Sequence, residues 1–413
     1  MEIRPILSAL LRSKTAPLLV AIQVALSLAI LANALYIVNQ RLAASARPSG
    51  IEDEANVVHI LSMPLEKPSH NEAMAQQQRE LEALRVVPGV VSAAWTNQMP
   101  MSRSGSSTTI THNRTQTQPS AHPAIYFGPE AFVRTLGLKL IEGRDFKPDE
   151  VVEVDPDAED DGGNAVKTII ITQALAKHLF PEADSVVGKT FMLGFGDNGI
   201  EVRIVGVVER LQSPQAQTAA HGEHSMIVPI RISQRLWRYA VRTEPGQRDR
   251  VMAAAEEAVR KAWPAPGRIS GRTVEGDREG RYRNEKAMAW MLIGVSGLLL
   301  LVTISGIVGM TMLRVAQRKK QIGVRRALGA RWRDILRYFL TENFLITSAG
   351  IALGAVLALG LNQLLVSQLE LKKLPLSYLA FGAGALWLLG LAAVYGPASR
   401  AANTPPATAT RSV

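Results

Sequence analysis

A strongly basic segment between two long apolar runs constrains this chain more than any other feature of its sequence. Residues 314–337 carry nine Arg and Lys side chains and one acid, Asp334. The runs on either side, residues 287–313 and 343–369, contain no charged residue. An excess of Lys and Arg beside membrane spans marks the cytoplasmic side of a membrane protein. The segment therefore predicts a membrane protein and sets its topology.

Four apolar runs are long enough to cross a bilayer. They lack charged residues and cover residues 16–38, 287–313, 343–369 and 374–399. A cleaved signal peptide is the competing interpretation of the first run, which is too long for an ordinary one. Four spans place both termini on the side of the basic segment, and basic residues near the chain ends agree: Arg4, Arg12, Lys14, Arg400 and Arg411. Residues 41–286 are then outside the cytoplasm.

Polar and small residues within the spans predict contacts between helices. Gln23 and Ser27 lie four residues apart, so we expect both to face other helices and not lipid. Gly350 and Gly354 form a small-xxx-small pair that permits close packing, which leaves open whether the partner helix belongs to a second copy. Glu342 lies at the predicted start of the third span. The helix dipole is expected to stabilise its carboxylate there, with Arg333 or Arg337 nearby.

The net charge of +10 does not indicate a nucleic-acid partner. Much of the positive charge lies in short pieces beside the apolar runs, and the rest of the chain is nearly neutral. The basic character therefore reports orientation in a membrane. The chain has no cysteine, which excludes disulfides, zinc–thiolate sites and thiol catalysis.

The extracytoplasmic region begins and ends with the same order of elements. Alternating apolar residues and helical periodicity predict strand, helix and strand at residues 56–63, 70–86 and 90–96, and again at 236–243, 248–263 and 268–274. Two β-α-β units around an inserted region predict a split, ferredoxin-like layer. The predicted fold class is thus an α+β membrane protein, with four transmembrane helices and a large α+β domain of ferredoxin-like units with an inserted subdomain.

Three motifs in this region imitate functional sites. Gly188-Lys189-Thr190 ends like a phosphate loop, but Ala183 stands where the first glycine is required. The acidic run 149–161 lacks the spacing of a calcium loop, which favours a solvated loop. A crowded group in a polar loop favours an exposed loop over a metal site: His221, Glu223 and His224.

Within the basic segment, the string from Gln321 to Ala330 closely resembles the signature of the MacB/FtsX-like permeases of ABC transporters. In that family the segment joins the second and third membrane helices, and its coupling helix sits in a groove of a separate ATPase. The resemblance implies an ATPase-coupling interface at Gln321, Ile322, Gly323, Arg325, Arg326, Ala327, Leu328, Gly329 and Ala330. The family often has Glu at the position of Gln321, so one charge is missing here. The alternative role for such a basic helix is a lipid-headgroup anchor.

Further segments share the resemblance. Residues 126–146 and 171–208 look like the extracytoplasmic core domain of MacB-like permeases, and residues 397–407 resemble a weakened form of the family's closing motif. The domains expected are residues 1–40 with the first span, residues 41–286 as a periplasmic core domain, and residues 287–413 as an FtsX-like permease domain with its coupling loop at 314–342.

The resemblance implies a permease subunit of the bacterial inner membrane with no catalytic site and no directly bound cofactor. ATP and Mg would be bound by a separate ABC ATPase, and a second permease copy or paralogue would complete a dimer in the lipid membrane. A periplasmic adaptor and an outer-membrane channel are left open, as is the cargo. The alternative function is an FtsX-like signalling subunit that regulates a cell-wall hydrolase or sensor. A chemoreceptor-like sensor is disfavoured because three spans follow the outer region.

Overall fold

The computed structural model describes residue 10 and residues 15–158, 165–194, 196, 199–216, 220–263, 266–369 and 373–403. These residues form two compact units, one of residues 43–284 and the other of the segments before and after it. Basic residues near the chain ends lie outside the described part: Arg4, Arg12, Lys14 and Arg411. The same holds for the last three residues of the acidic run and for the closing motif beyond Asn403.

The membrane unit is built on four helices that are long and apolar enough to cross a membrane, counted over the described residues. They are α2 (Thr15–Ser45), α7 (Val274–Gln317), α9 (Trp332–Leu369) and α10 (Leu376–Ala402). Two of them begin well before the predicted spans. Helix α7 includes the polar stretch before residue 287, and α9 includes the end of the basic segment, because a helix continues through charged residues when these find partners or water.

Helices α2 and α7 meet through polar side chains, as the sequence predicts. Gln23 donates from Nε2 to the carbonyl of Val302 at 2.9 Å, and the hydroxyls of Ser27 and Thr303 lie 2.7 Å apart. Polar groups inside a membrane need protein partners since lipid offers none. The prediction that Gln23 and Ser27 face other helices is therefore confirmed.

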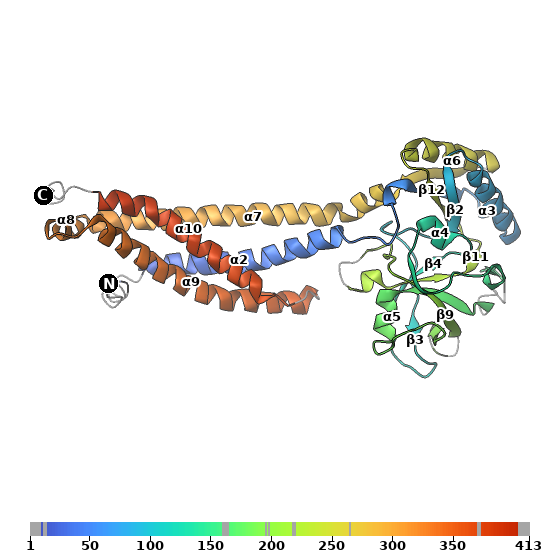
Figure 1. Ribbon diagram of the computed structural model, residues 1–413, viewed down its shortest axis with the longest axis horizontal. Coiled ribbons are helices and arrows are strands. Elements are labelled where there is room, and N and C mark those ends of the chain that lie inside the picture. The colour runs from blue at the N-terminus through green and yellow to red at the C-terminus, as the bar shows by residue number, and fades with distance from the viewer. Residues whose placement is uncertain are drawn as a thin grey trace. The chain divides into compact units, whose positions relative to one another are not determined.

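A four-stranded antiparallel sheet forms one layer of the outer unit, and its strand order is β13-β1-β12-β2. Its strands are β1 (Val57–Pro64), β2 (Val90–Thr96), β12 (Trp237–Thr243) and β13 (Gly267–Thr273), with helices α3 (His70–Arg85) and α6 (Arg248–Ala262). Figure 1 shows both helices beside this sheet. The order is that of a split β-α-β layer, so the predicted ferredoxin-like units are confirmed.

A carboxylate lies at the centre of this layer. Glu80 of α3 is fully buried and accepts hydrogen bonds from four side chains. The donors are Ser62 Oγ at 3.0 Å, Gln76 Nε2 at 2.7 Å, Trp237 Nε1 at 2.8 Å and the Tyr239 hydroxyl at 2.7 Å. Burial and the neighbouring Glu80 raise the pKa of Tyr239 well above its usual value. The oxygens of this buried side chain are thus satisfied by four oriented donors.

The inserted subdomain contains a seven-stranded sheet, as far as the described residues show, with the order β3-β8-β9-β7-β10-β4 and β5 beside β9. Its strands are β3 (Ile110–Thr111), β4 (Ala124–Phe127), β5 (Leu140–Gly143), β7 (Thr168–Thr172), β8 (Thr190–Leu193), β9 (Ile200–Val208) and β10 (Ser225–Val228). The outer unit also contains two short α-helices, α4 (Phe132–Leu136) and α5 (Gln173–Leu179), and the paired strands β6 (Val152–Val154) and β11 (Ile230–Ile232). Its short 3₁₀ helices are η1 (Glu54–Asn56), η2 (Pro148–Glu150) and η5 (Ala220–Glu223).

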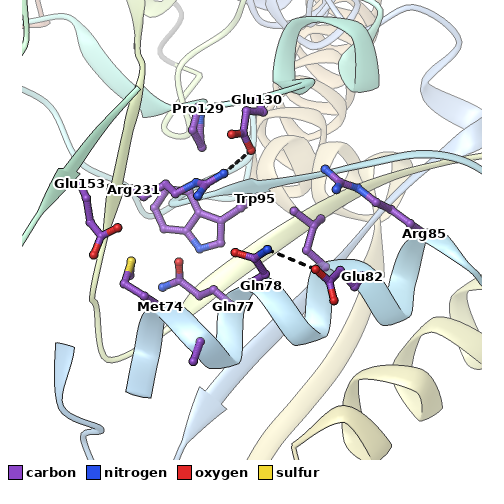
Figure 2. A pocket seen from close by; sticks show the side chains of 12 residues that line it. Met74, Gln77, Gln78, Glu82, Arg85, Trp95, Pro129, Glu130, Glu153 and Arg231 are labelled. Atoms are coloured by element: carbon purple, nitrogen blue, oxygen red, sulfur yellow. Dashed lines mark hydrogen bonds and ion pairs between the residues drawn. The ribbon is translucent and has the colours of Figure 1, made fainter. Parts of the chain in front are cut away.

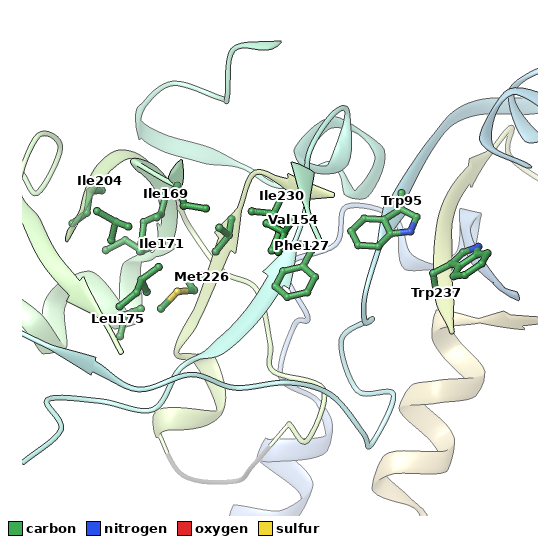
Figure 3. Packing of buried hydrophobic residues seen from close by; sticks show 14 of the residues in the cluster. Trp95, Phe127, Val154, Ile169, Ile171, Leu175, Ile204, Met226, Ile230 and Trp237 are labelled. Atoms are coloured by element: carbon green, nitrogen blue, oxygen red, sulfur yellow. The ribbon is translucent and has the colours of Figure 1, made fainter. Parts of the chain in front are cut away.

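One hydrophobic core joins the two sheets. It extends from Ile169, Ile171 and Ile204 of the inserted sheet to Trp237 of the ferredoxin-like layer (Figure 3). Trp95 and Phe127 stack with ring centroids 6.3 Å apart, each from a different layer. Residues 43–284 consequently pack as a single unit.

Candidate functional site

The basic segment folds as a short helix and a reversal of the chain. Helix α8 (Lys319–Ala327) is followed by Gly329, whose φ of 94° lies in the left-handed region that favours glycine. Asp334 then accepts a hydrogen bond from the backbone N–H of Arg331 at 2.9 Å at the start of α9. The helical part of the basic segment is thus interrupted at Gly329.

One side of α8 is packed against the membrane unit. Ile322 is 8% exposed and belongs to a cluster with Ile335, Phe339 and Ala398 of α9 and α10. Arg326 donates from Nη1 to the carbonyl of Ala402 at 2.7 Å, and Figure 1 shows α8 beside this end of α10. The helix therefore has a fixed orientation on the bundle.

The other side of α8 is apolar and uncovered. Leu328 is 83% exposed and Val324 is 51% exposed, and the two lie four residues apart on one face of the segment. The remaining exposed positions from Lys319 to Ala330 are polar, small or basic: Lys319, Lys320, Gln321, Arg325, Ala327 and Gly329. Val324 and Leu328 therefore form a small uncovered apolar patch in a basic segment, and we call them the apolar pair.

The nine residues of the predicted interface are thus divided between two roles. Ile322 and Gly323 are buried, and Arg326 is half-buried against α10, so these residues orient the helix. Arg325 lies 5.5 Å from the ring of Tyr338, a distance at which cation–π attraction fixes a guanidinium. The outward positions remain available to a partner.

A buried ion pair joins the helices on either side of α8. Arg314 of α7 binds Glu342 of α9, with side chains 9% and 3% exposed, and Arg318 lies 3.7 Å from the same carboxylate oxygen. The predicted position of Glu342 at a helix start beside Arg333 or Arg337 is wrong, because α9 already begins at Trp332. The true partners lie on another helix, which local spacing does not reveal.

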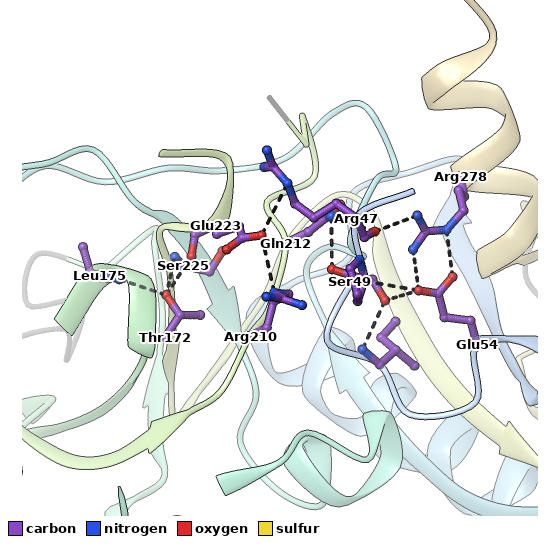
Figure 4. A network of polar contacts seen from close by, with 12 residues as sticks. Arg47, Ser49, Glu54, Thr172, Leu175, Arg210, Gln212, Glu223, Ser225 and Arg278 are labelled. Carbon is purple, nitrogen blue, oxygen red and sulfur yellow. Dashed lines mark hydrogen bonds and ion pairs between the residues drawn. The ribbon is translucent and has the colours of Figure 1, made fainter. Parts of the chain in front are cut away.

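Polar contacts also fix the outer end of α7 (Figure 4). Arg278 binds both carboxylate oxygens of Glu54, at 2.9 and 2.5 Å, and donates to the carbonyls of Ser45 and Arg47. Burial opposes ionisation of Glu54, but the hydrogen bonds from Arg278 and Ser49 outweigh it, so the pKa of Glu54 is lowered. We call these contacts of Arg278 the outer clamp.

A second contact in the same turns of α7 is buried. His59 Nε2 lies 2.7 Å from Asp277 Oδ2, and their side chains are 3% and 6% exposed. This contact joins the start of α7 to strand β1. The first turns of α7 are therefore held by two independent polar contacts within the outer unit.

The side chains of the histidine loop contact neighbouring protein groups. Glu223 lies 3.4 Å from both Arg47 and Arg210, which engages its carboxylate (Figure 4). Over the described residues, no group of three or more His, Asp or Glu side chains is placed to hold a metal. The expectation of an exposed loop is wrong for His224, which is only 9% exposed and packs on His178. Burial, then His178 and His221, lowers the pKa of His224 to about 4.

The acidic run also pairs with basic groups where it is described. Arg144 binds Glu150 at 2.7 Å, His70 lies 2.9 Å from Glu153, and Lys67 lies 2.6 Å from Asp157. Three acids in the described part of the run are thus paired with basic groups.

A cavity of about 190 Å³ lies in the outer unit, and sequence reasoning did not identify it. Figure 2 shows the indole of Trp95 above α3, with Gln77 and Gln78 beneath it and the Arg231–Glu130 ion pair on the opposite side. The residues that line this cavity come from segments far apart in the chain, so no local sequence motif predicts it.

The glycine pair of the third span packs against α2. A Cβ on Gly350 would lie 2.7 Å from the carbonyl oxygen of Ala21, and one on Gly354 would lie 2.8 Å from that of Ala25. Both glycines therefore allow α2 and α9 of the same chain to approach closely.

Four apolar helices, an oriented basic helix with an exposed apolar pair, and a mixed α/β outer unit define a membrane protein with a large domain beside its spans. Two family models match the sequence: the MacB-like periplasmic core domain over residues 24–261 and the FtsX-like permease C-terminal domain over residues 293–406. The first match alone covers more than half of the chain. The chain belongs to the MacB/FtsX-like ABC transporter permease family.

Individual relatives agree with this assignment. The chain is 23% identical over 260 residues to the uncharacterized ABC transporter permease YvrN of Bacillus subtilis, and the aligned segment covers 59% of each protein. It is 36% identical over 128 residues to the macrolide export ATP-binding/permease protein MacB of Bradyrhizobium diazoefficiens, 30% of this chain and 19% of that protein. The matches thus span less than two thirds of these relatives.

A solved structure is also similar. The periplasmic region of MacB from Actinobacillus actinomycetemcomitans matches 56% of this chain and 94% of its own length, with 13% identity and a TM-score of 0.36.

The four apolar helices and the matched periplasmic core domain fit a protein of the bacterial inner membrane. Membership in a permease family indicates a non-catalytic subunit.

Proposed function

We propose that this chain is the permease subunit of a MacB-like ABC transporter and that α8 docks into a separate ATPase. The apolar pair is the observation that carries the proposal. Val324 and Leu328 are exposed although α8 itself is held on the bundle by Ile322 and Arg326. An oriented helix with a free apolar contact and a cationic rim suits a groove with apolar walls and acidic edges.

The mechanism we propose is mechanical transmission. ATP and Mg are bound by the partner ATPase, and its closure moves α8. The Arg314–Glu342 pair makes α7 and α9 respond together, because separating it would leave a charge buried without its partner. Helix α7 is continuous from Val274 to Gln317, and the outer clamp holds its first turns, which supports transfer of the movement to the outer unit.

The remaining assignments follow from the same proposal. Both termini and α8 lie in the cytoplasm, and the outer unit lies in the periplasm. A second permease copy or a paralogue completes the transporter, with export or efflux as its task. A periplasmic adaptor and an outer-membrane channel are possible further partners in the assembly, and the signalling alternative replaces them by a cell-wall hydrolase.

Two double variants separate ATPase docking from a lipid anchor. Val324→Ser with Leu328→Ser removes the apolar pair without a change of charge, and we expect it to insert normally and to lose the ATPase that co-purifies with the wild type. Arg333→Ser with Arg337→Ser removes two exposed cations of the same segment and serves as the control. Mass spectrometry of the purified complexes identifies the partners.

The outcomes discriminate between the functions. Loss of an ATPase from the first variant alone supports docking through the apolar pair. Retention of the ATPase by the first variant refutes the proposed docking surface, and the absence of any co-purifying ATPase from the wild type favours the lipid anchor. A co-purifying hydrolase in place of an adaptor favours the signalling alternative.

A further inference from the structure

Two polar groups of α9 are buried in the membrane unit without a protein partner. Asn343 is 7% exposed and Thr347 is fully buried. Neither Asn343 Nδ2 nor Thr347 Oγ1 has a hydrogen-bond partner among the described residues of the protein. Such groups are unfavourable inside a membrane protein because lipid cannot replace the missing bonds.

Both groups face the same glycine of α10. A Cβ on Gly390 would lie 3.1 Å from Asn343 Nδ2 and 3.3 Å from Thr347 Oγ1. The absence of a side chain lets the α10 backbone lie directly against these polar tips. Each backbone carbonyl of α10 can accept a second hydrogen bond in addition to its helical one. A small shift of α10 along α9 therefore offers acceptors that the present arrangement does not use.

Two other threonine hydroxyls in the described part of the bundle are paired, in contrast to that of Thr347. Thr303 donates to the carbonyl of Leu299 at 2.8 Å and meets Ser27, and Thr311 donates to the carbonyl of Ile307 at 2.7 Å. The hydroxyls of these two threonines therefore have hydrogen-bond partners within the bundle. The contact of Thr347 with α10 is the exception among these three.

Helix α10 is also connected to α8. Its residue Ala402 accepts the hydrogen bond from Arg326 of α8. A movement of α8 therefore acts on α10 at one end of that helix. Since packed helices change between discrete arrangements, two registers of α10 on α9 are physically reasonable.

We propose that the contact of Asn343 and Thr347 with Gly390 is a sliding joint that alternates between two arrangements. In the arrangement described here both polar groups lack partners. In the other, α10 is displaced along α9 and its carbonyls accept hydrogen bonds from both groups. This inference rests on the proposed coupling for its role in a transport cycle, but the joint itself is testable without the ATPase.

The first experiment uses Thr347→Val, which replaces the unpaired hydroxyl by a methyl group of similar size. Relief of the unpaired group stabilises the present arrangement, so the melting temperature of the full chain in lipid nanodiscs rises by roughly 2–4 °C. Thr303→Val is the matched control and lowers the melting temperature, because its hydroxyl is paired. A lower melting temperature for Thr347→Val overturns the joint and indicates that an ordered water satisfies the hydroxyl.

The second experiment locks the joint. The chain contains no cysteine, so Thr347→Cys with Gly390→Cys provides one possible intramolecular disulfide. The new Cβ of residue 390 lies close enough to residue 347 for this bond. We expect the oxidised protein to retain the bound ATPase but to lose its permease-dependent ATP hydrolysis, and a reductant to restore it. Unchanged hydrolysis after complete oxidation overturns the sliding joint.

The two proposals fail in different ways. If no ATPase co-purifies with the wild type, the coupling function is wrong, whereas the opposite shifts of Thr347→Val and Thr303→Val still test the joint. If the ATPase binds and Thr347→Val leaves its hydrolysis unchanged, coupling stands and the joint has no part in it. We expect instead a roughly tenfold decrease in hydrolysis with normal ATPase binding.

Discussion

Arg278→Met tests whether the outer clamp holds the start of α7. The wild-type guanidinium donates four hydrogen bonds, two to Glu54 and one each to the carbonyls of Ser45 and Arg47. Methionine keeps the apolar stem but removes all four. Bonds to charged groups contribute about 1.5–3 kcal/mol each when buried. Both side chains are about one-fifth exposed, so solvent reduces the total to about 2–3 kcal/mol.

Hydrogen exchange of the full chain in nanodiscs measures this effect locally. A loss of 2–3 kcal/mol in the free energy of local opening accelerates amide exchange about 30- to 150-fold. We expect this change in the first turns of α7, from Val274 to Asn284. Arg272→Met is the control, because Arg272 is exposed and lies 3.7 Å from its acidic neighbour Asp277.

The outcome that would refute the clamp is equally specific. Wild-type exchange in Arg278→Met, or equal acceleration in Arg272→Met, means that these bonds do not hold α7. Under the proposed function, Arg278→Met keeps the ATPase but weakens the ATP-dependent response of the outer unit. Loss of the ATPase itself would place the defect elsewhere.

Three further predictions concern stability. Glu80→Leu leaves the Trp237 and Tyr239 donors buried without their acceptor, so we expect a loss of about 3–5 kcal/mol, measured by thermal unfolding. Gly354→Val forces α2 and α9 apart and lowers stability by about 1–3 kcal/mol, whereas Gly360→Val, with open space around it, serves as a neutral control in the same melting assay. Because the folded-state pKa of Glu54 is lowered, its contribution is complete above the unfolded value of 4.5 and is lost as the pH falls through the folded pKa; the protection factors of amides at the start of α7, corrected for intrinsic exchange, should therefore decrease only below about pH 4.5.

The sequence predicted features that depend on local pattern. Uncharged runs identify membrane helices because the bilayer excludes charge over a known length, and paired β-α-β patterns identify the ferredoxin-like layer. Gln23 and Ser27 were predictable because a polar group in lipid must find a partner. Each of these inferences needs one segment and one physical rule.

The features that local pattern missed depend on contacts between distant segments. Glu342 was expected to lie near Arg333 or Arg337, which are close in sequence, but Arg314 approaches from another helix. Helix α7 continues into polar sequence since Glu54 and His59, more than 200 residues earlier in the chain, hold its first turns. The burial of Thr347 Oγ1 without a hydrogen-bond partner depends on the packing of α10 against α9, which the sequence does not show.

The contacts of α2 also have a consequence for biosynthesis. Gln23, Ser27 and Asn33 find their partners on α7 and α9, between 276 and 325 residues later in the chain. During translation α2 therefore enters the bilayer long before those residues exist. Until then these side chains lack their partners on α7 and α9, and of the three only Asn33 has a hydrogen bond within the described residues of α2, to the carbonyl of Ala29. A chain interrupted after the outer unit would retain this defect and be a target for membrane quality control.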